Sequence, residues 1–169
     1  MALSRNVYVE GRAAAALASS GDLSRAANLA DDLRKRFPLS TWVNGCFLPD
    51  TYAAIEIQKS SATRAVERLQ STSSCPLLGI IYRRGTVYLG AREGVQAAAE
   101  FQKILDHRGF DMLSSFYPLA YLGLARAYAL QGDTTKSRTA YQDFFALWKD
   151  ADPDIPILKD AKSEYAKLK

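Results

Sequence analysis

Histidine is the first side chain to test for acid–base chemistry, and the 169-residue chain contains a single one, His107. It lies in the stretch LDHRGFD, and no serine or cysteine stands at a spacing recognisable from a hydrolytic site. Gly109 is expected to end a helix just after it, and the helix dipole stabilises a histidine near a carboxyl end. We therefore predict a structural role for His107.

Three aspartates, Asp150, Asp152 and Asp154, alternate with alanine and proline, a pattern that could offer carboxylate ligands to calcium. An EF-hand loop also needs a central glycine and a terminal glutamate, and both are missing here. The run is predicted to be a linker with helix caps, and no metal site is expected.

The two cysteines, Cys46 and Cys75, form no CxxC pair and have no histidine cluster nearby, so a zinc site is not indicated. Two interpretations stay open. A single disulfide would join the cysteines in an oxidising environment, whereas two reduced, half-buried thiols are typical of a cytosolic protein. We favour the reduced thiols and a cytoplasmic location, although the sequence does not say whether the two cysteines lie close together.

The stretch GTVYLGAREG, residues 85–94, contains three glycines but lacks the GxGxxG pattern, and no β-strand is expected before it. It predicts a helix with a loose end and not a phosphate cradle. Because no nucleophile–base pair or metal set is visible either, the sequence predicts no catalytic residues and no cofactor.

The formal net charge is +4, and the basic and acidic residues are interspersed. A nucleic-acid-binding protein usually gathers its lysines and arginines into one stripe, whereas the candidates here, residues 34–36 and 83–84, are short. No apolar run has the length needed to cross a membrane, and the N-terminal residues lack the pattern of a signal peptide. We expect neither nucleic-acid binding nor membrane insertion by this segment.

Two stretches, residues 13–22 (AAAALASSGD) and 124–133 (LARAYALQGD), are apolar runs that end in Gly-Asp. Glycine can end a helix in the left-handed conformation, and aspartate can cap the next helix. After each glycine, a small residue follows at the fifth position, then packing residues at helical spacing, then a proline. These residues are Ala26, Ala30, Leu33 and Pro38 in the first unit, and Ser137, Tyr141, Phe144 and Pro153 in the last. Each unit predicts helix, turn, helix and stop.

Two weaker copies lie between these units. Residues 85–105 hold Gly85 and Tyr88 in the first helix and Ala97, Phe101 and Ile104 in the second. Residues 49–70 hold Tyr52, Ala65 and Leu69 in the same positions, with Ser60-Ser61 as the turn. The small residues of the second helices, Ala26, Ala65, Ala97 and Ser137, follow one another at spacings of 39, 32 and 40 residues. Such spacings are typical of two-helix repeats with connectors of variable length.

The recurring pattern resembles the tetratricopeptide repeat (TPR), which has an aromatic, Leu-Gly and Tyr in its first helix and Ala, an aromatic and Ala in its second. The last unit is the most similar, through Tyr121, Leu124, Ala125, Tyr128, Ser137, Tyr141 and Pro153. The resemblance implies an all-α, right-handed α-solenoid of about four helical hairpins over residues 1–169. The expected repeats are residues 5–38, 46–75, 78–109 and 118–152.

A capping helix is expected at about residues 155–168. Its apolar stripe, Ile157, Leu158, Ala161, Tyr165 and Leu168, is predicted to cover the last repeat around Tyr141 and Phe145.

Residues 97–109 and 143–169 resemble the carboxyl end of a bacterial family known especially from Acidobacteria. In that family a TPR array follows a eukaryotic-like Ser/Thr protein kinase domain or, in some members, a winged-helix DNA-binding domain. Nothing in this chain resembles either head domain, since Gly-rich phosphate loop, HRD and DFG are all missing. The resemblance implies a noncatalytic protein–protein interaction module, the sensory or recruiting tail of a bacterial Ser/Thr protein kinase. The alternatives are the tail of a winged-helix transcription regulator and an enzyme that uses the groove of the array.

The first helices of a TPR array line its concave face. In the predicted register this face holds the candidate peptide-binding residues Tyr8, Phe47, Asp50, Tyr82, Thr86, Leu122 and Arg126. The carboxylate clamp of chaperone-binding TPR proteins needs several Lys, Arg and Asn residues here, but the corresponding residues are Gly11, Ala15, Ala54 and Leu122. A mixed aromatic and apolar groove favours a helix or an extended peptide with apolar anchors. Alternatively, some of these residues pack between repeats.

We expect a monomer or weak dimer with a protein or peptide ligand that the sequence does not identify.

Overall fold

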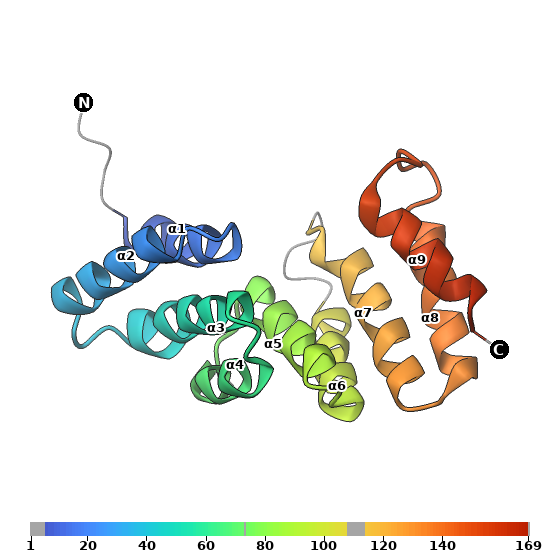
Figure 1. Ribbon diagram of the computed structural model, residues 1–169, viewed down its shortest axis with the longest axis horizontal. Coiled ribbons are helices and arrows are strands. Elements are labelled where there is room, and N and C mark those ends of the chain that lie inside the picture. Colours follow the sequence, from blue (N-terminus) through green and yellow to red (C-terminus); the bar gives the residue numbers. More distant parts are fainter. Residues whose placement is uncertain (1–5, 73, 108–113, 169) are drawn as a thin grey trace. The chain divides into compact units, whose positions relative to one another are not determined.

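The computed structural model describes residues 6–72, 74–107 and 114–168, and these ranges contain helices and no strand (Figure 1). The α-helices of the described ranges are α1 (Val7–Ser19), α2 (Leu23–Arg36), α3 (Leu48–Gln58), α4 (Ala62–Leu69), α5 (Leu78–Gly90), α6 (Gly94–Asp106), α7 (Phe116–Leu130), α8 (Thr134–Leu147) and α9 (Pro156–Ala166). A π-helical turn, η1 (Val43–Phe47), leads into α3, and a 3₁₀ turn, η2 (Gln70–Thr72), follows α4. The predicted all-α class is confirmed. In this part of the chain, no helix combines the length and apolarity that a membrane crossing requires.

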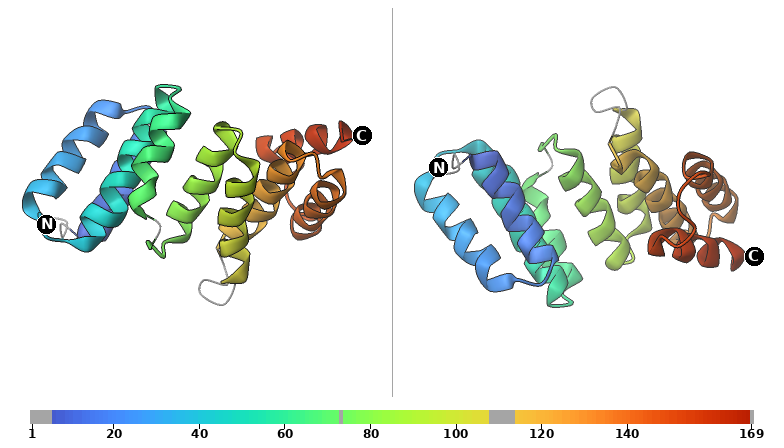
Figure 2. Two further views of the ribbon diagram at one scale, coloured as in Figure 1. Left: turned by 90° about the horizontal axis from the view of Figure 1, so that it is seen from below. Right: turned by 90° about the horizontal axis from the view of Figure 1, so that it is seen from above.

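The chain divides into two compact units, Met1–Ile80 and Ile81–Lys169. In the first unit, α1 packs on α2 and α3, and α3 packs on α4. In the second unit, neighbours in sequence pack on one another from α5 to α9. Figure 2 shows the hairpin of α7 and α8 from two further sides. Packing between successive helices is the arrangement of a helical repeat protein, and the single four-repeat array stays a prediction.

Four helical hairpins turn in the same way. The second residue after each first helix has a positive φ: Gly21 at 90°, Ser60 at 58°, Arg92 at 62° and Gly132 at 77°. In each turn the next residue donates its backbone N–H to the carbonyl five positions earlier, as Asp22 does to Leu17 at 2.9 Å and Ser61 does to Glu56 at 2.9 Å. This is the Schellman motif, which satisfies carbonyls left open at a helix end. The predicted Gly-Asp and Ser-Ser turns are therefore confirmed, and a fourth lies at Arg92.

Small buried residues stand at fixed distances from these turns. Seven positions before the left-handed residue are Ala14, Ala53, Gly85 and Ala125, and five positions after it are Ala26, Ala65, Ala97 and Ser137. All eight are buried. In the last hairpin the two positions are in direct contact, because Ser137 Oγ donates to the carbonyl of Ala125 at 2.8 Å. The second-helix small residues predicted from the sequence are thus confirmed as core positions, and those of the second hairpin follow the same register as the other three. The assignment of Tyr52 to the position of Tyr88 is wrong by one helical turn, because Tyr52 stands eight positions before its left-handed residue and Tyr88 stands four before.

The ring of Phe101 fixes the packing of α5, α6 and α7. It is fully buried, and a Cβ atom added to Gly85 of α5 or Gly123 of α7 would lie 2.7 Å or 2.5 Å from its ring atoms. Carbon atoms at such distances overlap, so both helices need glycine where the ring enters. Tyr82 packs against the same ring, with the two centroids 5.6 Å apart.

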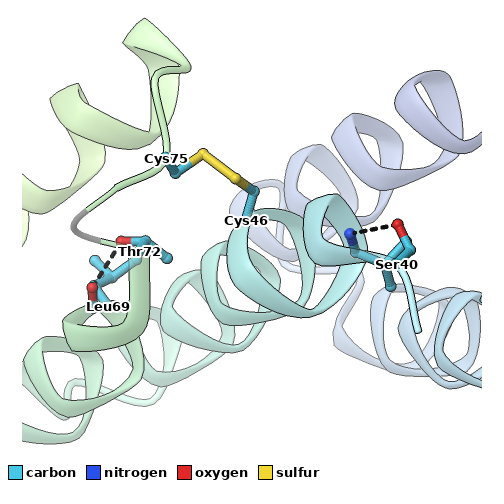
Figure 3. The surroundings of a disulfide bond; sticks show 6 residues. Ser40, Cys46, Leu69, Thr72 and Cys75 are labelled. Atoms are coloured by element: carbon cyan, nitrogen blue, oxygen red, sulfur yellow. Dashed lines mark hydrogen bonds between the residues drawn. A yellow bond between two sulfur atoms is a disulfide. The ribbon is translucent and has the colours of Figure 1, made fainter. Parts of the chain in front are cut away.

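The core of the first unit contains a disulfide between Cys46, in η1, and Cys75, in the segment that precedes α5 (Figure 3). The expectation of two reduced, half-buried thiols is therefore wrong. The Cα atoms are 5.7 Å apart, and the two residues are only 6% and 4% exposed. They belong to an apolar cluster with Val43, Phe47 and Ile80, and they meet because η1 and this segment enter the same cluster.

Helix α9 covers α8 as the sequence predicted. Leu158 and Ala161 are buried, while Ile157 and Leu168 are only partly so. The ring of Tyr165 packs against those of Tyr141 and Phe145, with centroid distances of 5.8 and 5.7 Å. Pro156 begins the helix at a position where its missing N–H does no harm.

The turns make a first test. Replacing Gly132 with Val should lower the free energy of unfolding by about 1–2 kcal/mol, because a β-branched residue is strained at positive φ. Replacing Ser60 with Gly should raise it by up to about 1 kcal/mol, since glycine relieves the same strain. Urea unfolding of each variant measures both effects. Gly90→Val is the control, because Gly90 has no positive φ and open space at its Cβ. Equal stabilities of the Gly132 and Ser60 variants would contradict the turn assignment.

The packing of Phe101 makes a second test. Gly123→Ala should lower the melting temperature markedly and reduce the free energy of unfolding by roughly 1–3 kcal/mol, because the added methyl group overpacks the ring. Gly90→Ala adds the same methyl group to the end of α5, where nothing lies within 4 Å. If both alanine variants melt alike, the ring does not set the distance between these helices.

Candidate functional site

The candidate residues of the first unit lie around the ring of Phe47. That ring is 2% exposed and packs on Gly11, where a Cβ would lie 2.4 Å from it. Asp50 is also buried, at 7% exposure. Tyr8 is 43% exposed, and its ring contacts those of Trp42 and Phe47, with centroids 5.4 and 5.7 Å apart. Of these three candidates, only Tyr8 is open to a ligand in this structure, because the other two are packed inside the unit.

The candidates of the second unit come from α5 and α7. Leu122 is 1% exposed and belongs to the core. Thr86 is half-buried, and its hydroxyl donates to the carbonyl of Arg83 at 2.8 Å. Tyr82 is half-buried between the rings of Phe101 and Phe116, and this burial raises the pKa of its hydroxyl. The core packing of Leu122 and Phe47 corresponds to the alternative that candidate residues pack between helices.

Arg126 is the one cation among the predicted site residues, and α9 binds it. Its Nε and one terminal nitrogen donate to the two carboxylate oxygens of Glu164, each at 2.9 Å. The hydroxyl of Tyr141 donates to the same carboxylate at 2.7 Å. Three helices, α7, α8 and α9, therefore meet at one carboxylate, which is a geometry suited to anchoring α9.

The electrostatics of this cluster follow from burial and from hydrogen bonding. Burial on its own would raise the pKa of Glu164, but the hydrogen bonds from Arg126 and Tyr141 outweigh it and lower the pKa. For the cation Arg126, burial on its own would lower the pKa, but the hydrogen bonds to Glu164 outweigh it and raise the pKa. Burial first, and then the bond to Glu164, raise the pKa of Tyr141. The cluster thus favours the charged carboxylate and guanidinium together with a neutral phenol.

An open hollow of about 520 Å³ lies over a different side of α7, where α6 and α8 also contribute. Its buried and half-buried lining is aromatic and apolar: Leu105, Tyr121, Leu124, Tyr128 and Ala140. Its exposed lining is polar: Gln102, Thr135, Lys136, Thr139 and Asp143. The three α7 residues are spaced i, i+3 and i+7, so they share one face of the helix.

The polar groups at the hollow are partly engaged. The ammonium group of Lys136 pairs with Asp133 at 2.9 Å and lies 5.6 Å from the centre of the Tyr128 ring. The amide of Gln102 donates to Asp106 at 2.8 Å. The lining therefore offers apolar contact and hydrogen bonding to a ligand.

The other residues considered for chemistry have local partners. His107 ends α6, its Nδ1 lies 2.7 Å from the carbonyl of Lys103, and Gly109 lies outside the described residues. Asp152 accepts from the backbone N–H of Asp154 at 2.8 Å. The contact of His107 agrees with its predicted structural role. The aspartates do lie in a linker, but the expected helix cap is wrong, because Ile155 is the N-cap of α9 and no side chain caps that helix. Among the described residues, no group of three or more His, Cys, Asp or Glu side chains is placed to hold a metal ion.

The comparisons leave the family of this chain open: it matches no protein-family model, no curated protein and no solved structure.

Sequence reasoning noticed the three α7 residues of the hollow but assigned them another role, and it missed the residues that α6 and α8 contribute. Tyr121, Leu124 and Tyr128 supported the resemblance to the TPR as packing residues, and their i, i+3, i+7 spacing was the signal of an apolar helix face. No sequence pattern indicated the hydrogen bonds between Arg126 and Glu164, because the two residues are 38 positions apart.

Glu164→Gln should destabilise the second unit at pH 7 by roughly 1 kcal/mol. The change is modest because the Glu164 side chain is 37% exposed and water screens the pair. Since the folded state lowers the pKa of Glu164, its contribution is complete above the ordinary carboxylate pKa and is lost as the pH falls through the folded value. The difference in melting temperature from the unmodified chain should therefore shrink below about pH 4.5. Asp160→Asn removes the same charge from α9 without a described partner and should have little effect at either pH. A pH-independent difference for Glu164→Gln would contradict this account.

Proposed function

We propose that this chain is a noncatalytic protein–protein interaction module built as a TPR-like, right-handed α-solenoid, with α9 as its terminal cap. One observation carries the proposal: the same left-handed turn, with a buried small residue seven positions before it and another five positions after it, recurs in four hairpins. Stacked hairpins of this kind bury a core between neighbours and leave helix faces open, and repeat proteins use such faces for recognition.

The hollow over α6, α7 and α8 is the proposed binding surface. Its aromatic and apolar floor suits the side chains of a peptide with apolar anchors, and its polar rim suits the peptide's backbone or charged groups. The half-buried Tyr82 and Thr86 of the second unit form the second candidate surface, on the face proposed from the sequence, and the exposed side of Tyr8 is a separate candidate in the first unit. Arg126 contributes less to that face, because Glu164 already holds both sides of its guanidinium.

The parent protein is proposed to be a bacterial Ser/Thr protein kinase, with this chain as its sensory or recruiting tail. The support is the resemblance of residues 97–109 and 143–169 to such tails. The module's partner would then be a protein or peptide that the kinase senses or recruits.

A displayed library of random 15-residue peptides, selected on the full chain, provides a probe for the surface. Thr139→Arg places a long charged side chain over the hollow and should weaken the selected peptides at least tenfold in Kd. Ala146→Arg adds the same side chain to an exposed position of α8 outside the hollow and should leave Kd unchanged. Fluorescence anisotropy with labelled peptides gives the constants, and circular dichroism checks that both variants fold.

The loss of peptide binding in one arginine variant or the other distinguishes the two candidate surfaces of the second unit. If Thr86→Arg abolishes binding and Thr139→Arg does not, the face proposed from the sequence is the site and the hollow is not. If selection yields no peptide with a measurable Kd, the chain is not a peptide-binding module of this type.

A further inference from the structure

The disulfide is placed where a reductant has little access. Cys46 and Cys75 are 6% and 4% exposed, and the cluster around them is built from apolar residues such as Val43, Leu48 and Ile80. Thiol–disulfide exchange needs a thiolate to reach one of the two sulfurs, and redox-sensing cysteines are accordingly exposed and close to positive charge. A buried pair in an apolar cluster has the features of a structural crosslink.

The disulfide also fixes the segment that contains Cys75 to the core of the first unit. Cys46 lies in η1, at the start of the helical segment that continues as α3, whereas Cys75 lies in the segment that follows η2 (Figure 3). The backbone N–H of Cys75 donates to the carbonyl of Thr72 at 2.9 Å, and the disulfide joins this segment to the core of the first unit. The two cysteines are 29 positions apart, so the bond closes a long loop and restricts the unfolded chain strongly.

We propose that the Cys46–Cys75 disulfide is a structural crosslink introduced during folding in an oxidising compartment. The two thiols give up two electrons and two protons to an oxidant of the disulfide class, which is released as a dithiol. The inference replaces the cytoplasmic location expected from the sequence. It does not depend on the proposed function, because it concerns the state of the first unit and not the hollow of the second.

The redox state in the cells that make the protein is the direct test. Acid quenching followed by alkylation and mass spectrometry should find both cysteines linked to each other and unlabelled. Two alkylated thiols in freshly quenched cells would overturn the proposal.

The accessibility of the bond is tested on the purified, oxidised full chain. Dithiothreitol should reduce the folded chain at least about 100-fold more slowly than the chain unfolded in urea, because burial protects the sulfurs. Equal rates would identify an accessible switch and overturn the structural role.

The structural role is also measured by melting. The double variant Cys46→Ala, Cys75→Ala should melt at least about 10 °C below the oxidised chain, and the single variant Cys75→Ala should melt close to the double variant. Unchanged melting temperatures would overturn the proposal. If the variants do not fold, the rates of reduction and the in-cell alkylation still decide whether the disulfide is a structural crosslink.

Discussion

The ring of Phe101 imposes the constraint on which the second unit depends. It stands on α6, contacts α5 at Gly85 and α7 at Gly123, and leaves no room for a side chain at either glycine. Three helices can therefore share one buried ring only because two of them lack a Cβ there. The same ring supports Tyr82, and Leu122, next to Gly123 in the chain, is buried in the same region of α7. Two of the residues assigned to a ligand face are thus part of the packing that holds α5 and α7 in place.

The first unit reaches a closed core by other means. Phe47 packs on Gly11, which is again a ring on a glycine, but the unit adds a covalent bond between Cys46 and Cys75. A crosslink that closes a loop of this length stabilises the folded state by about 3–4 kcal/mol through the unfolded chain. That contribution is of the same order as burying one or two large apolar side chains. The segment that precedes α5 is thus held by a covalent bond as well as by apolar packing.

The sequence predicted what local physics determines. Gly21 and Gly132 marked two turns, because glycine alone adopts positive φ without strain, and the small residues around them gave the helix register. Ser60 and Arg92 adopt the same conformation, but their residue types give no such signal. Both are exposed, and backbone hydrogen bonds from Ser61 to Glu56 and from Glu93 to Tyr88 close their turns. Whether Cys46 and Cys75 meet, and whether the carboxylate of Glu164 reaches Arg126, depends on how distant segments pack. Residue spacing contains no information about that.

The position of α9 decides which side of α7 stays open in this structure. The bidentate bond between Glu164 and Arg126 turns the most obvious ligand-binding cation of the predicted face into an anchor for the chain's own last helix. Tyr141 completes the anchor from α8. A neighbouring face of α7, with Tyr121, Leu124 and Tyr128, lines the open hollow. One helix therefore serves stability on one face and offers an apolar surface on another, and periodicity alone assigns both faces the same character.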